Sequence, residues 1–298
     1  MRFFVLLWCV WCANALCSDA DGIKLSRLVD SMREIPAAAM QSAVRKTIED
    51  AWCAYRANAW GRDALLPVSG SGSDWMRTAT TAADALDTLL MARLPQHAKE
   101  TRDMVVRTLR KPRRDDSVSV GNLIKSVIGG LVAAHALGRD TEALGLVAEF
   151  ADNASVVFDS PSGIPYPSVN LLRREATPVT HYALVAEAGS MRTEYDALSD
   201  ALGATARYEP PAEAQRRIVG ACVEGLIPSV LIDVRSARPD GDSVVSIGKG
   251  MGDFYGGLLK SWIQGGRRDI TLLSAHQDFV HGVTTRLLRR SPKEVCGD

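Results

Sequence analysis

The chain has 298 residues, of which 46% are hydrophobic and 23% charged, and its 35 basic residues balance its 35 acidic ones. This length and composition are typical of one large or two modest globular domains, and exclude a disordered or fibrous chain. A net charge of zero provides no electrostatic attraction for a polyanion, so we expect no nucleic-acid partner.

The N-terminus has the pattern of a secretory signal peptide. Met1 and Arg2 precede an apolar run over residues 3–13, and Ala13-Asn14-Ala15 is a small-residue cleavage candidate. We therefore predict a signal peptide over residues 1–17 and a location in the ER or Golgi lumen. An uncleaved signal anchor is the alternative, although the run is short for a bilayer span. No later segment is expected to cross a membrane.

Cysteine usage agrees with the secretory pathway. Three of the six cysteines lie in or beside the signal segment, and three remain: Cys53, Cys222 and Cys296. These are too scattered for a zinc site, so no metal ligands are predicted from them. One disulfide among them is compatible with an oxidising lumen, with the pairing left open. Asn153 begins an Asn-X-Ser glycosylation sequon, which fits the same compartment.

The rest of the chain is predicted to be helical, because apolar residues recur at helical spacing. The expected helices cover residues 37–58, 78–92, 97–109, 120–137, 142–151, 182–202, 212–224, 254–264 and 272–289. Short irregular or β pieces are expected near residues 156–158 and 230–234. Helices joined by short loops predict an all-α fold of antiparallel hairpins closing into an (α/α) barrel. A helical solenoid is the rival, disfavoured because the chain contains no internal repeat.

An aromatic stripe runs along the first predicted helix of the globular region. Trp52, Tyr55 and Trp60 are spaced so that they share one helix face, and Gly61 ends the helix. A packed core face is the simpler interpretation, and a platform for sugar stacking is the alternative.

Four polar residues are candidates for a binding site. Asp84 and Asp87 are three apart in an apolar helix, where burial of both would be costly without partners. These two aspartates either face solvent or line a polar pocket. The same two alternatives apply to Glu194 in a later helix. Asn170 follows a loop rich in proline and glycine, and such rigid loops often bind ligands.

Taken in order, these stretches resemble glycoside hydrolase family 47, the class I α-1,2-mannosidases. The matching blocks, between residues 36 and 290, are Ala59-Trp60-Gly61-x-Asp63, Asp84-Ala85-Leu86-Asp87-Thr88-Leu89, Gly129-Gly130-Leu131, Gly163-Ile164-Pro165-Tyr166, Val169-Asn170-Leu171, Glu194-Tyr195 and Leu258-Leu259-Lys260-x-Trp262. The resemblance implies a partial (α/α)7 mannosidase-like domain over residues 36–290, an incomplete version of the family's seven-hairpin barrel.

The resemblance also implies inverting hydrolysis of terminal α-1,2-linked mannose on high-mannose N-glycans, with one carboxylic acid and one carboxylate flanking the bond. Asp84 and Glu194 match the family's substrate-contact carboxylates, and we assign Asn170 to the same sugar site. A Ca²⁺ ion is expected from the family. The segment that usually carries its ligands has no counterpart in this sequence.

Several positions depart from the family's motifs. Aligned on the glycines at 129 and 130, the acid position carries Asn122, and the following substrate-binding arginine is Ser126. An amide cannot release a proton at useful pH. In a later motif, this chain has Gly252 where the family has an aspartate, and Asp253 follows one place away as a shifted carboxylate. In the same motif, Gly256 stands where the family has a glutamate.

Two main hypotheses follow. The first is an α-1,2-mannosidase of the secretory pathway that acts on terminal mannose of high-mannose N-glycans. The second is a catalytically inactive, mannosidase-like protein of ER quality control that binds glycans or glycoproteins. An incomplete barrel would expose apolar helix faces, so a partner protein covering its open edge is also expected. The third hypothesis is that this chain is a fragment with no stable fold.

Overall fold

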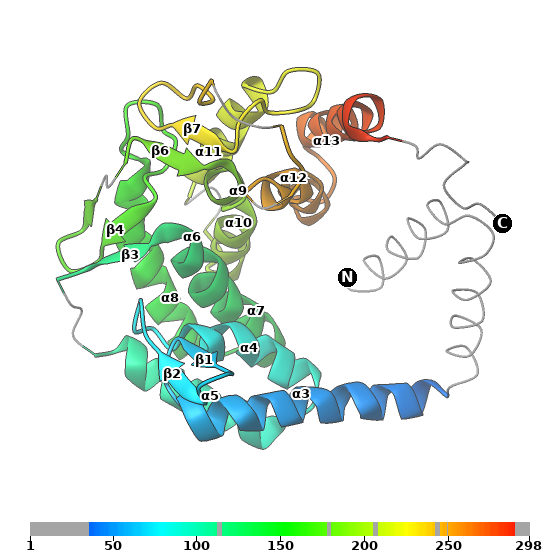
Figure 1. Ribbon diagram of the computed structural model, residues 1–298. Helices are drawn as coiled ribbons and strands as arrows, with labels where there is room; N and C mark the ends of the chain where they lie inside the picture. The colour runs from blue at the N-terminus through cyan, green and yellow to red at the C-terminus, as the bar shows by residue number, and fades with distance from the viewer. Residues whose placement is uncertain are drawn as a thin grey trace. The chain divides into compact units, whose positions relative to one another are not determined.

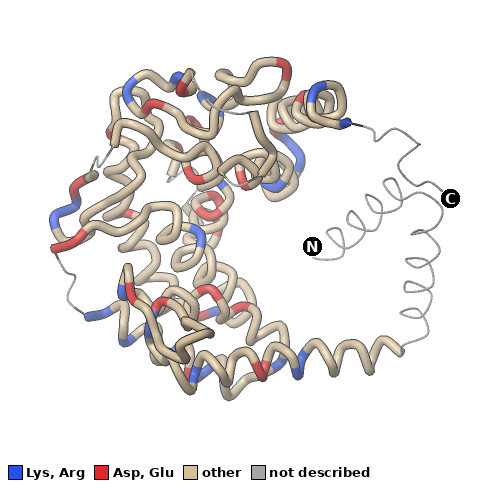
Figure 2. The backbone as a smooth tube through the Cα atoms, viewed as in Figure 1, with Lys and Arg blue, Asp and Glu red and all other residues tan. Residues whose placement is uncertain are grey.

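The computed structural model describes residues 36–111, 115–177, 180–204, 208–241, 245–248 and 250–289. The chain forms two compact units, residues 1–54 and residues 55–298, and Figure 1 shows the elements of each. The predicted signal peptide and Cys296 lie outside the described residues. Basic and acidic residues are interspersed along the described chain (Figure 2), in keeping with the balanced composition.

Helices dominate the described residues, and the all-α prediction is confirmed. The α-helices are α3 (Ala37–Ala59), α4 (Thr80–Met91), α5 (Pro95–Leu109), α6 (Val120–Asn122), α7 (Gly129–Gly138), α8 (Thr141–Ala154), α9 (Val185–Ala188), α10 (Arg192–Ala201), α11 (Pro210–Gly220), α12 (Gly252–Gln264) and α13 (Ile270–Gly282). Two π-helical segments, η1 (Leu123–Ile128) and η3 (Val283–Leu287), and one 3₁₀ helix, η2 (Ser155–Phe158), complete the set.

Three small antiparallel sheets lie between the helices. The strands are β1 (Ala64–Leu66), β2 (Ser71–Ser73), β3 (Ser117–Ser119), β4 (Ser168–Asn170), β5 (Glu175–Ala176), β6 (Tyr182–Leu184) and β7 (Leu231–Asp233). They pair as β1-β2, β3-β4-β5 and β6-β7. Each strand has two or three residues, too few to produce the alternation from which strands are predicted. Only β7 falls where a β piece was expected, and the segment at 156–158 is 3₁₀ helix.

The single helix predicted over residues 182–202 is wrong. The segment begins with strand β6, which pairs with β7, and then forms α9 and α10 with a break between them. Gly189 lies at the break, where a Cβ atom would come 2.4 Å from the ring of Phe254. The close approach of α12 therefore requires glycine at this position. The helix predicted over 212–224 also ends early, at Gly220.

The core of the second unit is built around the continuous segment α6–η1–α7. Leu123, Ile124, Val127 and Ile128 are fully buried on it. At Gly130 a Cβ atom would come 2.5 Å from the carbonyl oxygen of Ala83, so glycine allows α7 to lie directly against α4.

The same segment, Val120–Gly138, is long and apolar enough by length and composition to cross a membrane. From the sequence, no segment after the signal peptide is expected to be long and apolar enough to cross a membrane, and this segment differs from that expectation. Most of the segment is buried inside the protein, and a core helix of a soluble protein passes the same test.

A buried carboxylate organises the loop that leads into α4. Asp63 is fully buried, and its two oxygens accept hydrogen bonds from the backbone N–H groups of residues 75–78 and of Thr80, at 2.6–3.2 Å. Burial alone would raise the pKa of this carboxyl. The backbone donors outweigh burial and hold the pKa below its ordinary value. Arg77 and Ala79 have φ of 58° and 55° in the loop that Asp63 holds.

The predicted C-terminal end of the first helix is confirmed. Helix α3 ends at Ala59, and Gly61 follows with φ +77°, a conformation that glycine adopts without strain. Tyr55 is buried as a core residue, and its hydroxyl donates to the carbonyl of Arg62 at 2.6 Å. Trp60 is 37% exposed, so the aromatic stripe is only partly core.

Candidate functional site

A cleft of about 680 Å³ lies among α4, η1, α7 and α10. Asp84 and Asp87 reach it from α4, Lys125 from η1 and Glu194 from α10. Three of the predicted polar candidates, two neighbours on α4 and one on the distant α10, are therefore placed around one space. Hydroxyl groups of a sugar donate hydrogen bonds to carboxylates and accept them from an ammonium group.

The surroundings of Asp84 make its carboxyl harder to ionise than that of a free aspartate. Although Asp84 is exposed at the cleft surface, partial desolvation of its carboxyl raises the pKa above the ordinary value, and the neighbouring charge of Asp87 raises the pKa further. Asp87 itself accepts a hydrogen bond from the hydroxyl of Thr88 at 3.1 Å. The helical spacing of three residues places both carboxyls at the cleft.

Glu194 is held more deeply than Asp84. Burial raises its pKa, and the opposing contributions of the Thr193 hydroxyl, Lys125 and Lys260 are smaller. The hydroxyl of Thr193 donates to the Glu194 carboxylate at 3.0 Å. Gly129 lies against its side chain, with a Cβ position 3.0 Å from the Glu194 Cγ atom.

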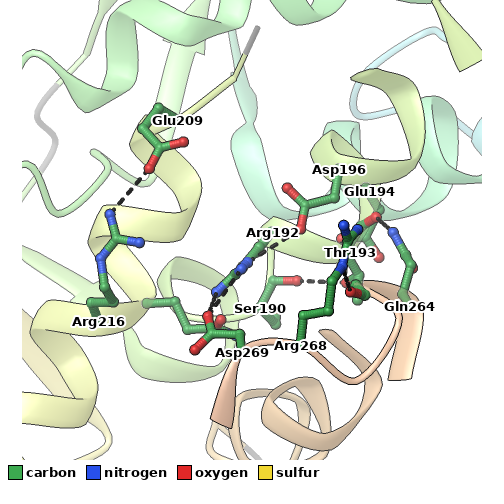
Figure 3. A network of polar contacts seen from close by, with 12 residues as sticks. Ser190, Arg192, Thr193, Glu194, Asp196, Glu209, Arg216, Gln264, Arg268 and Asp269 are labelled. Carbon is green, nitrogen blue, oxygen red and sulfur yellow. Dashed lines mark hydrogen bonds and ion pairs between the residues drawn. The ribbon is translucent and has the colours of Figure 1, made fainter. Parts of the chain in front are cut away.

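A polar network fixes α10, and with it Glu194, to the following helices (Figure 3). Arg192 donates to Asp196 within α10 at 3.2 Å and to Asp269, before α13, at 3.3 Å. Gln264, the last residue of α12, donates to the carbonyl of Thr193 at 2.8 Å. The position of Glu194 thus depends on three helices.

Asn122, which the resemblance predicts to occupy the acid position, does not lie among the residues that line this cleft. Asn122 is exposed at the end of α6, and its backbone N–H donates to Ser119 Oγ at 3.4 Å. Ser126, at the family's arginine position, is half-buried on η1. Neither residue can supply a proton or a positive charge at neutral pH.

Lys125 is the basic side chain that η1 presents to the cleft. Its ammonium donates to Asp253 at 2.6 Å and to the carbonyl of Ala186 at 3.3 Å. Asp253, the shifted carboxylate, lies exposed in the first turn of α12. The ion pair joins η1 to α12.

Sequence reasoning missed a further carboxyl at this end of the molecule. Glu187 lies on α9 beside Gly121, where a Cβ atom would come 2.7 Å from the Glu187 Cδ atom. Burial raises the pKa of Glu187, Lys125 opposes that rise and Asp253 adds to it. Within a predicted helix of mixed polarity, this residue had no pattern to separate it from solvated glutamates.

Asn170 is not brought to the cleft. It is 6% exposed on β4, and its amide donates to Asp115 at 2.8 Å. Its side-chain oxygen accepts from the backbone N–H groups of Leu172 and Arg173, each at 3.0 Å. The side chain therefore closes the turn after β4, which is a structural use of an asparagine.

The structure also places the sequon asparagine and two of the cysteines. Asn153 is 5% exposed within α8, whereas glycosylation acceptors lie on surface loops. The folded protein therefore does not support the sequon as evidence for the secretory compartment. Cys53 and Cys222 are both free thiols in the described part of the chain.

The calcium expected from the family has no matching donor set in the described ranges. No group of three or more His, Cys, Asp or Glu side chains there is placed to hold a metal ion. Calcium requires six to eight oxygen ligands, and the cleft carboxyls are arranged without such a cage. The residues described therefore do not fit the ion.

Comparison with known proteins identifies the class. The family model described as Glycosyl hydrolase family 47 matches residues 47–296, and the chain belongs to this family. The solved structure of an alpha-1,2-mannosidase from Trichoderma reesei matches with a TM-score of 0.72 and 22% identity, covering 83% of this chain and 54% of that one. This likeness confirms the (α/α) barrel fold.

Among curated relatives, the Endoplasmic reticulum mannosyl-oligosaccharide 1,2-alpha-mannosidase of Homo sapiens is 33% identical over 255 residues. That alignment covers 84% of this chain and 36% of the relative. The Mannosyl-oligosaccharide alpha-1,2-mannosidase IA of Spodoptera frugiperda is 28% identical, over 85% of this chain and 39% of its own length. The chain thus spans less than half the length of these relatives.

Proposed function

We propose that this protein engages the terminal α-1,2-linked mannose of high-mannose N-glycans in the secretory pathway. We further propose that it binds this sugar rather than hydrolysing it. The observation that carries the proposal is the cleft itself, with Asp84, Asp87 and Glu194 converging beside Lys125. The relatives named as mannosidases support the substrate class.

Binding rather than hydrolysis is favoured by the residue at the acid position. Inverting hydrolysis needs an acid that protonates the leaving oxygen and a base that activates water. Asn122 cannot act as that acid, and loss of a general acid typically lowers the rate about 10²–10⁴-fold. The cleft carboxyls and Lys125 can still hydrogen-bond the hydroxyls of a sugar.

Hydrolysis remains the second candidate function because of the three carboxyls with raised pKa. Asp84, Glu187 and Glu194 each bind protons more tightly than ordinary carboxyls do. A carboxyl with a raised pKa is the form in which glycosidases keep their general acid.

The test uses the purified chain and a high-mannose N-glycan with terminal α-1,2-linked mannose. Isothermal titration calorimetry measures binding, and chromatography of the incubated glycan measures released mannose. We expect binding with no release. Glu194→Gln and Asp84→Asn should each weaken binding about tenfold, because each removes a charged hydrogen-bond acceptor from the cleft.

Asp159→Asn is the matched control, since Asp159 is an exposed aspartate that does not line the cleft. Binding that survives both cleft substitutions would contradict the proposed site. Mannose release by the wild-type chain would contradict binding without hydrolysis and would support the second candidate function, hydrolysis. Asn122→Glu then asks whether restoring a carboxyl at the acid position produces or raises release.

A further inference from the structure

A second groove, of about 810 Å³, is lined by residues before α4, on α5, on β3 and on α8. It shares no lining residue with the mannose cleft. A groove of this size is in the range of ligand-binding pockets. The proposed mannose site leaves it without a use.

The floor of the groove is apolar. Six side chains that line it are between 3% and 7% exposed: Met76, Met104, Leu109, Val118, Phe150 and Leu171. They come from five separate segments of the chain and all line this one groove. Such a floor accepts an aliphatic or aromatic side chain, and contact with it would remove the remaining apolar surface from water.

The rim of the groove is basic. Its charged lining residues are Arg62, Arg77, Arg107, Lys111, Asp74 and Asp116, four cations and two carboxylates. Each carboxylate is already paired with one arginine, in the ion pairs Arg62–Asp74 and Arg77–Asp116. The groove therefore carries two positive charges in excess.

Arg107 and Lys111 supply that excess. Both are exposed: Arg107 lies in the last turn of α5, and Lys111 lies two residues beyond the end of that helix. The Nε atom of Arg107 donates to the carbonyl of Asp103 in its own helix at 3.1 Å, and the side chain lines the groove. Its two terminal nitrogens can bind a carboxylate in a bidentate manner.

Strand β3 adds a reason to expect an extended ligand. It lies at the edge of the sheet β3-β4-β5, and its central residue Val118 belongs to the groove floor. Edge strands are positions where an extended peptide adds its own backbone hydrogen bonds.

We propose that this groove binds an extended acidic peptide segment of a partner protein. An apolar side chain of the segment covers the floor, and its carboxylates lie beside Arg107 and Lys111. A neutral glycan would leave the basic rim unused, and a simple inorganic anion would leave the apolar floor unused. An acidic peptide with an apolar anchor satisfies both.

The test is selection of peptides from a random phage-displayed library on the full chain. The most enriched peptide is then synthesised with a fluorescein label, and its binding is measured by fluorescence anisotropy. We expect enriched sequences to combine acidic residues with aromatic or long aliphatic ones. Arg107→Glu should weaken binding of the labelled peptide about fivefold or more, because it replaces an attraction by a repulsion.

Lys99→Glu is the matched control, because it makes the same charge change at an exposed position of α5 that does not line the groove. It should leave peptide binding unchanged. Thr108→Trp places a large side chain in the groove and should abolish binding. Thermal unfolding followed by circular dichroism shows whether each variant keeps its fold.

Three results would overturn the proposal. They are enrichment of peptides without acidic and apolar residues, binding that is equally sensitive to Lys99→Glu, and no enrichment at all. Vesicles of phosphatidylserine and phosphatidylcholine form a separate arm. Retention on these vesicles that depends on Arg107, without peptide binding, would assign the groove to an anionic membrane surface instead.

Discussion

Hydrogen-bond donors decide whether the pKa of a carboxyl in this protein is raised or lowered. Asp63 and Glu194 are both withdrawn from solvent, yet the pKa of the first is lowered and that of the second is raised. The difference lies in the number of N–H donors around each group. Asp63 receives a ring of backbone donors, whereas Glu194 receives few compensating contacts for its burial.

We expect Asp63→Asn to destabilise the fold by about 3 kcal/mol, because an amide oxygen is a weaker acceptor and one set of N–H donors loses its partner. Urea unfolding followed by circular dichroism measures the change. Since the folded pKa is lowered, the stabilisation is complete above the ordinary carboxyl pKa and is lost as the pH falls through the folded value. The variant should therefore lose less stability than wild type on acidification. Equal acid sensitivity in both proteins would contradict this role.

Unlike Asp63→Asn, the substitution Glu194→Gln should stabilise the folded protein at neutral pH. A raised folded pKa means that the folded state binds its proton more tightly, so stability falls as the pH rises from the ordinary value through the folded one. The substituted amide carries no charge to bury, and we expect the variant to be more stable than wild type at neutral pH and similar at acid pH. Unfolding midpoints over a pH series measure this. Weaker glycan binding together with higher stability would identify a residue kept for function.

At the scale of elements, glycine determines how closely the helices pack. Gly130 lets α7 approach α4, and Gly189 lets α12 approach the segment between α9 and α10. These contacts position the cleft, because Asp84 is on α4 and Glu194 is on α10.

Gly130→Ala should destabilise the protein by about 2 kcal/mol, because the new Cβ would meet the backbone of Ala83 at 2.5 Å, and backbone atoms cannot rotate away. Gly145→Ala is the control, since a Cβ at that helical position meets no atom within 4 Å. This control should be neutral or slightly stabilising, because alanine has the higher helix propensity. Thermal unfolding distinguishes the two variants, and equal unfolding midpoints would contradict the packing argument.

At the scale of the whole molecule, the family assignment and the proposal of binding without hydrolysis rest on different residues. The family is shown by the match over residues 47–296. The proposal rests on the amide of Asn122 at the predicted acid position, because inverting hydrolysis needs a proton donor. The predicted partner protein at an open barrel edge and the boundaries 1–17 and 36–290 stay predictions. Exposed apolar residues such as Ile270 on α13 are where such a partner would be sought.

A terminal mannose ligand should raise the unfolding temperature of the full chain. A ligand that binds only the folded state at about 100 times its dissociation constant stabilises by about 2.7 kcal/mol. Differential scanning calorimetry with methyl α-mannoside and with a high-mannose glycan measures the shift, and a non-ligand sugar alcohol serves as the control. No shift at concentrations that saturate binding would contradict a specific site.

The sequence by itself determined most of the helices, the family and the polar candidates Asp84, Asp87 and Glu194, because helical periodicity and ordered motifs are local properties of the chain. It also showed that position 122 carries an amide. Only the tertiary structure decided that these carboxyls share one cleft with Lys125, that Glu187 is half-buried beside Gly121, and that Asn170 closes a turn. Strands of two or three residues, close approaches at glycine and the burial of a carboxyl depend on partners distant in sequence, so no local pattern contains them.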